Sequence, residues 1–102
     1  MGISVRVESD AGEIEAEVAD PAELTQTLLP DAADASWSCL RFVDPGGATL
    51  FNHLQVATLI GELQRRLAEL DDPDVKEHLG EILQLVESAE GQTGTFVRFV
   101  GE

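Results

Sequence analysis

Two segments near the start of the chain alternate between apolar and polar residues. The first covers residues 3–7, and the second covers residues 13–18 after a Ser-Asp-Ala-Gly turn. Alternation with a period of two is typical of a β-strand with one buried face. The pattern therefore predicts a β-hairpin whose apolar side chains share one face and whose charged side chains, mostly glutamates, share the other.

Two longer segments, 56–70 and 75–86, repeat apolar residues every three or four positions. This spacing predicts two amphipathic helices, each with one apolar stripe. Both have capping signals at their start, because Asn52 is followed three residues later by a glutamine and Asp72 is followed directly by a proline. The short connection between them predicts a helical hairpin.

The remaining segments predict one short helix and three more strands. An Asp-Pro pair at Asp20 predicts a helix start, and the proline after Leu29 ends that helix. Residues 39–44 and 48–51 flank an Asp-Pro-Gly-Gly turn, which predicts a second hairpin. Residues 95–100 are mostly β-favouring and predict a final strand that joins the sheet.

These elements follow one another in the order β-β-α-β-β-α-α-β. The fold class predicted is α+β, with a mostly antiparallel sheet of about five strands and a helical hairpin packed on one face. A chain of 102 residues fits one domain, so residues 1–102 are assigned to a single α+β domain.

The charge of the chain is strongly negative, with 20 acidic and 6 basic residues and a formal net charge of −14. Such a charge opposes direct nucleic acid binding and contact with anionic lipid. No apolar stretch has the length of a membrane span, and the first residues lack the pattern of a signal peptide. With one cysteine and no intramolecular disulfide, we expect a soluble cytoplasmic protein.

The acidic residues are densest in the first third of the chain. Nine of them lie between Glu8 and Asp34, without any lysine or arginine. One interpretation is that this charge serves solubility. The other is a docking surface for a basic protein partner, formed on the first hairpin by Glu8, Asp10, Glu13, Glu15 and Glu17.

A second candidate surface comes from two matching segments, Leu-Arg-Phe-Val and Val-Arg-Phe-Val. If both are neighbouring strands, their arginines lie on one partly apolar sheet face. That face would bind an anion, a partner or a second copy of the chain in a homodimer, or its arginines would pair with glutamates of the first hairpin. Its residues are Arg41, Arg98, Val43, Phe96 and Val100.

The sequence lacks the motifs of common enzymes. It contains no HExxH, no phosphate-binding loop and no dinucleotide-binding glycine pattern, and His53 and His78 share no metal-ligand spacing. Each histidine is expected to be an ordinary surface or helix-end residue. Cys39, on a predicted apolar strand, is expected to be a buried, unreactive thiol. The acidic stripe at residues 74–81 is expected to be a solvated helix face. We therefore expect no cofactor and no metal, and an enzyme is the less favoured interpretation.

The chain resembles a group of short, uncharacterised, acidic bacterial proteins. The resemblance rests on Cys-Leu-Arg-Phe at residues 39–42, Asp-Pro at 44–45, Phe-Asn at 51–52, Leu-Gln at 54–55 and the closing Arg-Phe-Val-Gly at 98–101. It covers most of the chain and implies a shared α+β fold. It implies no activity, substrate or site residues.

The function expected from these features is that of a small acidic interaction module. It would bind a basic protein and regulate or neutralise it, as intracellular inhibitors and immunity proteins do; the comparison rests on size and charge. The alternative is a small enzyme or anion-binding domain that uses the face of Arg41 and Arg98.

Overall fold

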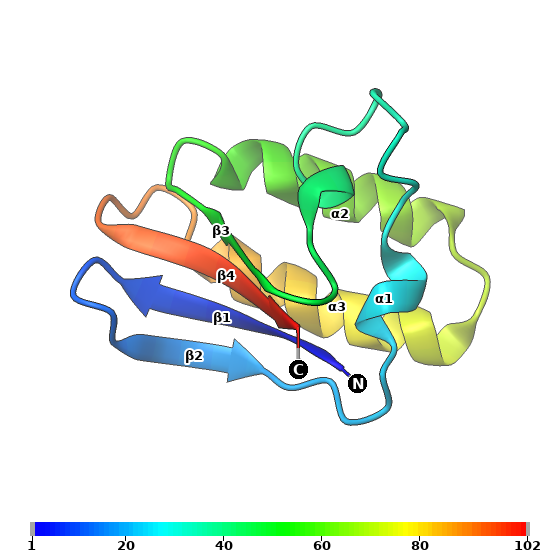
Figure 1. The fold of residues 1–102 in the computed structure, drawn as a ribbon, viewed down its shortest axis with the longest axis horizontal. Coiled ribbons are helices and arrows are strands. Elements are labelled where there is room, and N and C mark those ends of the chain that lie inside the picture. The colour runs from blue at the N-terminus through cyan, green and yellow to red at the C-terminus, as the bar shows by residue number, and fades with distance from the viewer. Residues whose placement is uncertain (1, 102) are drawn as a thin grey trace.

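A four-stranded antiparallel sheet forms one layer of the molecule (Figure 1). The computed structural model describes residues 2–101; Met1 and Glu102, which the single-domain assignment includes, lie outside the described residues. The strands occur in the spatial order β2-β1-β4-β3. Their bounds are Ile3–Ser9 for β1, Ile14–Val18 for β2, Ala48–Phe51 for β3 and Thr95–Gly101 for β4.

The helices form the second layer, and Figure 1 shows α2 and α3 together behind one face of the sheet. Their bounds are Thr25–Leu28 for α1, Val56–Glu69 for α2 and Pro73–Ser88 for α3. This arrangement confirms the α+β class and the helical hairpin on one sheet face. Within residues 2–101, no helix is both long enough and apolar enough to cross a membrane.

The core lies between the two layers, where the predicted apolar positions meet. Val5 of β1 pairs with Phe99 of β4, and both side chains are fully buried. Leu59 and Leu63 of α2 and Leu79 of α3 are also fully buried. Burial of such side chains stabilises the fold by about 1.5–3 kcal/mol each.

The start of α3 has the predicted cap. The Asp72 carboxylate accepts hydrogen bonds from the backbone N–H of Asp74 at 2.9 Å and of Val75 at 3.4 Å, with Pro73 at the first helical position. Because these N–H groups have no partner inside the helix, the cap contributes about 1 kcal/mol.

The strand predicted over residues 39–44 is wrong. Residues Leu40–Phe42 form a short 3-10 helix, in which Phe42 N–H donates to Cys39 C=O at 3.0 Å. A distant carboxylate, that of Glu62 of α2, accepts hydrogen bonds from the backbone N–H groups of Cys39 and Leu40 at the start of this turn. Strand β3 pairs with β4 and is the end strand of the sheet, so the predicted hairpin with residues 39–44 does not form.

Two further details of the prediction are corrected. Helix α1 begins at Thr25 and not directly after Asp20, because the intervening chain turns through Glu23, whose φ is +58°. In the first hairpin, a register shift pairs Ile14 with Glu8 while Ala16 pairs with Val7. Ile14 therefore leaves the apolar face on which alternation had placed it, and 53% of its surface is exposed.

Candidate functional site

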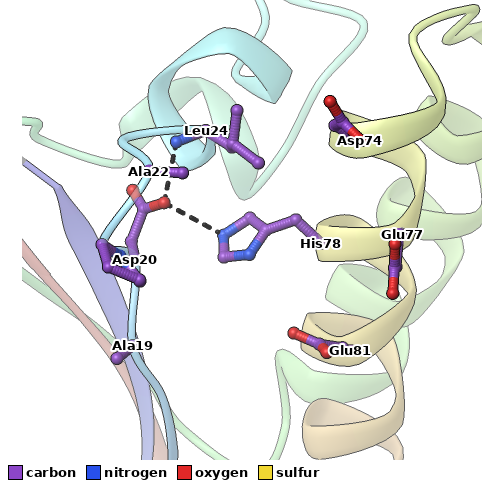
Figure 2. Close-up of a pocket in the computed structure, with 9 residues that line it drawn as sticks. Ala19, Asp20, Ala22, Leu24, Asp74, Glu77, His78 and Glu81 are labelled. Carbon is purple, nitrogen blue, oxygen red and sulfur yellow. Dashed lines mark hydrogen bonds and ion pairs between the residues drawn. The ribbon is translucent and has the colours of Figure 1, made fainter.

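The carboxylate of Asp20 joins three parts of the fold at the end of β2 (Figure 2). It accepts hydrogen bonds from the N–H of Leu24 at 2.7 Å, of Ile3 at 2.8 Å and of Thr25 at 3.1 Å. Burial alone would raise the pKa of the Asp20 carboxyl, but these backbone donors hold it below its ordinary value. Asp20 is therefore a charged anchor between the start of β1 and the start of α1.

His78 of α3 completes this cluster and is buried, not at the surface as the sequence suggested. Its Nε2 lies 2.7 Å from Thr25 Oγ1, with which it shares a hydrogen bond, and 3.4 Å from Asp20 Oδ1. The exposed fraction of His78 is 8%. No sequence motif links these three residues, so the sequence carried no signal for the cluster. His53, by contrast, is exposed as predicted.

The cluster of Thr25, His78 and Asp20 has the residue types of a hydrolytic triad but not its geometry. In such a triad, the carboxylate and the hydroxyl contact opposite nitrogens of the imidazole. Here Asp20 and Thr25 approach the same Nε2, and Thr25 has no exposed surface on which a substrate could sit. The contacts therefore tie α1 and α3 to the end of β2 and assign no catalytic role to Thr25.

A pocket of about 340 Å³ opens beside this cluster, between the end of β2 and α3. Figure 2 shows Asp74, Glu77 and Glu81 along α3, across from Asp20 and Ala22. The residues that line the pocket include four carboxylates and His78, but no lysine or arginine. This lining favours a cationic group and opposes an anionic one.

A second hollow of about 510 Å³ continues along β2 and α3. The two hollows share Ala19 and Glu81 and therefore adjoin, and we call them together the acidic groove. Five carboxylate residues line it, namely Glu17, Asp20, Asp74, Glu77 and Glu81. Residues 74–81 were predicted to form a solvated helix face, and in the structure this face borders a concave surface.

The acidic residues predicted on the first hairpin separate into two groups. Asp10, Glu13 and Glu15 are exposed. Glu8 is only 7% exposed and accepts a hydrogen bond from Arg98 at 3.1 Å, and Glu17 forms an ion pair with Arg6.

The strand register explains why Glu8 and Glu17 pair with arginines. Arg6 of β1 lies directly opposite Arg98 of β4. Like charges at directly opposed positions are destabilising, and a nearby carboxylate for each arginine offsets the repulsion. Glu17 and Glu8 supply these carboxylates, so part of the predicted docking surface has a structural role.

The predicted face of Arg41, Arg98, Val43, Phe96 and Val100 does not form as one surface. Because residues 40–42 are helical, Arg41 leaves the sheet and lies 4.3 Å from the ring centroid of Phe42. Val43 is buried in the core, with 6% of its surface exposed. Phe96, Arg98 and Val100 remain half-buried on the face of β4 opposite the helices. A homodimer that covers this smaller face stays a prediction, which light scattering would test.

Glu62 of α2 carries a buried carboxylate whose role was not predicted from the sequence. It accepts hydrogen bonds from the backbone N–H of Ser38 at 2.5 Å, of Leu40 at 2.9 Å and of Cys39 at 3.1 Å. Burial, together with the negative charge of Glu62, raises the pKa of the Cys39 thiol to about 11. Cys39 is therefore buried, as expected, and its thiol is only weakly acidic. The available signal was a charged residue beside the apolar stripe of the helix.

Within residues 2–101, no group of three or more His, Cys, Asp or Glu side chains is arranged to hold a metal ion. Comparison of the chain with protein-family models, with curated proteins and with solved structures found no match. The chemistry of the acidic groove and of the hairpin is therefore the basis for a functional proposal.

Proposed function

We propose that this protein is a binding module that docks a basic protein on its acidic side and thereby regulates or neutralises that partner. The observation that carries the proposal is the acidic groove, a concave surface that no lysine or arginine lines and to which α3 contributes the carboxylates of Asp74, Glu77 and Glu81. The exposed hairpin residues Asp10, Glu13 and Glu15 extend the same negative potential beyond β2. A lysine or arginine side chain of the partner fits this environment in both size and charge.

Most of the few basic residues of the chain pair with acids outside α3, which supports the proposal. Four of the six form ion pairs: Arg6 with Glu17, Arg98 with Glu8, and Arg65 and Arg66 with Glu69. In the part of the chain that the structure describes, no lysine or arginine forms an ion pair with the three acids that α3 contributes to the groove. Their charge remains available to a partner.

The stripe of acids on α3 has a small energetic cost. Asp74, Glu77 and Glu81 are spaced by three and four residues, and like charges at this spacing destabilise a helix by about 0.2–0.5 kcal/mol per pair. This is small against a typical stability of about 5–15 kcal/mol, so the fold tolerates it. A bound cation would remove the repulsion and convert the cost into binding energy.

The test compares two double variants that remove the same charge from α3 and its end. Glu77→Gln with Glu81→Gln alters the groove, whereas Glu87→Gln with Glu90→Gln removes two exposed acids that do not line it. Each variant and the wild type would be used to capture proteins from the native host, and association rates with any captured basic protein would then be measured at several salt concentrations.

We expect the wild type and the Glu87/Glu90 variant to capture the same basic protein, with an association rate that falls steeply with salt. The Glu77/Glu81 variant should associate at least about tenfold more slowly. Equal capture and equal rates for both double variants would contradict the proposal, because net charge alone would then explain binding.

A further inference from the structure

Strand β2 is an open edge of the sheet. It pairs with β1 on one side, and the order β2-β1-β4-β3 places no strand on its other side. Within residues 2–101, no backbone hydrogen bond from a loop reaches residues 14–19. Four of its five residues are exposed, and Val18 is half-buried. An edge of this kind is a template for another extended chain unless charge or shape protects it.

The hydrogen bonds at the end of β1 show which way its backbone groups point. Asp10 N–H donates to Gly94 C=O at 2.8 Å, and Ser9 N–H donates to Glu13 C=O at 2.8 Å. Because backbone groups alternate in direction along a strand, the even-numbered residues of β1 bond to β4 and the odd-numbered residues bond to β2.

The same alternation fixes the direction of one backbone unit of β2. Val5 pairs with Val18 and Val7 pairs with Ala16, so both pairs lie at hydrogen-bonded positions. Glu17 lies between these two partners and therefore directs its own N–H and C=O away from β1. These two groups form the outward-facing edge next to the acidic groove, which Glu17 also lines.

The groove lies directly beside this edge. An added strand would place alternate side chains over the hollow that Glu81, Gln84, Leu85 and Ser88 of α3 form. Its other side chains would lie on the opposite sheet face, beside Glu17. One face of the added strand would thus meet small polar and apolar groups with one carboxylate, and the other would meet Glu17.

We propose that the partner binds by adding an extended, Lys- or Arg-rich segment to β2 as a fifth strand, with its main chain bonded to Glu17. The inference rests on the proposed function and specifies its partner class. Charge decides the occupant: a second copy of β2 would bring Glu13, Glu15 and Glu17 against the same acids, and opposed like charges are destabilising. A basic segment pairs with them instead, and its backbone satisfies the open edge.

The test uses two peptides of equal charge, (Arg-Thr)5 and an (Arg-Pro)5 in which every arginine backbone nitrogen is methylated, so that neither edge of the second peptide has an N–H donor. Threonine favours strands and keeps its N–H, whereas proline has no N–H and is excluded from paired strand positions. We expect the wild type to bind (Arg-Thr)5 about tenfold more tightly than (Arg-Pro)5 at low salt. Hydrogen exchange of the Glu17 amide in the wild type should slow when (Arg-Thr)5 is bound and remain unchanged when (Arg-Pro)5 is present.

A matched pair of variants isolates the main chain. Glu17→Ala and Glu17→Pro both lose the carboxylate, but only the proline variant loses the outward N–H; an edge strand tolerates proline at such a position. Relative to Glu17→Ala, the Glu17→Pro variant should bind (Arg-Thr)5 about tenfold more weakly and (Arg-Pro)5 equally well.

The outcomes separate this inference from the proposed function. If both peptides bind the wild type equally and the Glu17 amide gains no protection, strand addition is wrong while acidic docking stands. If neither peptide binds at low salt, both are wrong. The exchange measurement needs only the wild type, so it decides the matter even if Glu17→Pro does not fold.

Discussion

Replacement of Glu62 by glutamine tests how the segment before β3 is held. The Glu62 carboxylate accepts hydrogen bonds from three consecutive backbone N–H groups, those of Ser38, Cys39 and Leu40, and only 8% of the residue is exposed. Glutamine has nearly the same shape, but it offers one acceptor oxygen and brings an NH2 group against these donors. At least one buried N–H then loses its partner.

The expected loss follows from these contacts. Hydrogen bonds to a charged group contribute about 1.5–3 kcal/mol each, and a buried donor without a partner costs about 1–3 kcal/mol. Because glutamine keeps one acceptor, we expect Glu62→Gln to lower the free energy of unfolding by about 3 kcal/mol. For a domain of this size, such a loss lowers the Tm by at least about 12 °C.

Urea unfolding followed by the fluorescence of Trp37 would measure the change, because this side chain is 3% exposed and packs against Arg65. The control is Glu69→Gln on the same helix. Glu69 is exposed and forms ion pairs with Arg65 and Arg66, so its loss should cost no more than about 1 kcal/mol. A second readout is Cys39, whose pKa should fall from about 11 when the negative charge of Glu62 is removed.

Equal stabilities of Glu62→Gln and Glu69→Gln would refute the reasoning. The 3-10 helix at Leu40–Phe42 would then be held by the burial of its own side chains and not by the carboxylate. If the Cys39 thiol is alkylated at the same rates in Glu62→Gln and in the wild type across pH 8–11, the negative charge of Glu62 does not act on this thiol.

Three further predictions concern charge and pH. The pKa of Asp20 is lowered in the folded protein, so its contribution to stability is present above pH 3.8 and is lost as pH falls through the folded pKa. Asp20→Asn should therefore lower stability at pH 7, and its stability should depend less on pH below 3.8 than that of the wild type, as followed by circular dichroism. The pKa of Cys39 is raised from 9.0 to about 11, so its contribution to the free energy of unfolding is complete below pH 9 and is lost as pH rises toward 11. In urea titrations at a series of pH values, the free energy of unfolding of Cys39→Ala should therefore fall less between pH 9 and 11 than that of the wild type. An equal fall in both proteins would count against burial of the thiol. Replacement of the exposed Glu13 and Glu15 by glutamine should slow association with a basic partner in low salt at nearly unchanged stability, and an unchanged rate in stopped-flow mixing would exclude the hairpin as the docking surface.

The sequence predicted correctly those helices and strands whose caps and periodicity come from residues close together in the chain. The Asp72-Pro73 pair marked the start of α3 because an aspartate reaches the free N–H groups of the first turn wherever that helix lies. The alternation of Ile3, Val5 and Val7 predicted β1, since a strand between two others buries one face continuously. The apolar stripes likewise predicted α2 and α3.

Residues 39–44 show where local patterns fail. Their alternation suits a strand, and β3, at the end of the order β2-β1-β4-β3, has an edge on which such a strand could pair. The N–H groups of residues 38–40 instead meet Glu62, more than twenty positions away in sequence. No property of residues 39–44 alone distinguishes these two outcomes.

The sequence by itself determined the acidity, the hairpin of glutamates and the two amphipathic helices, because charge and periodicity belong to the residues themselves. Only the tertiary structure decided which acids are available: Glu8 and Glu17 pair with arginines because the register opposes Arg6 and Arg98. It also created the acidic groove, since α3 packs beside β2. Concavity and pairing depend on which segments become neighbours, and long-range burial, not local propensity, selects those neighbours.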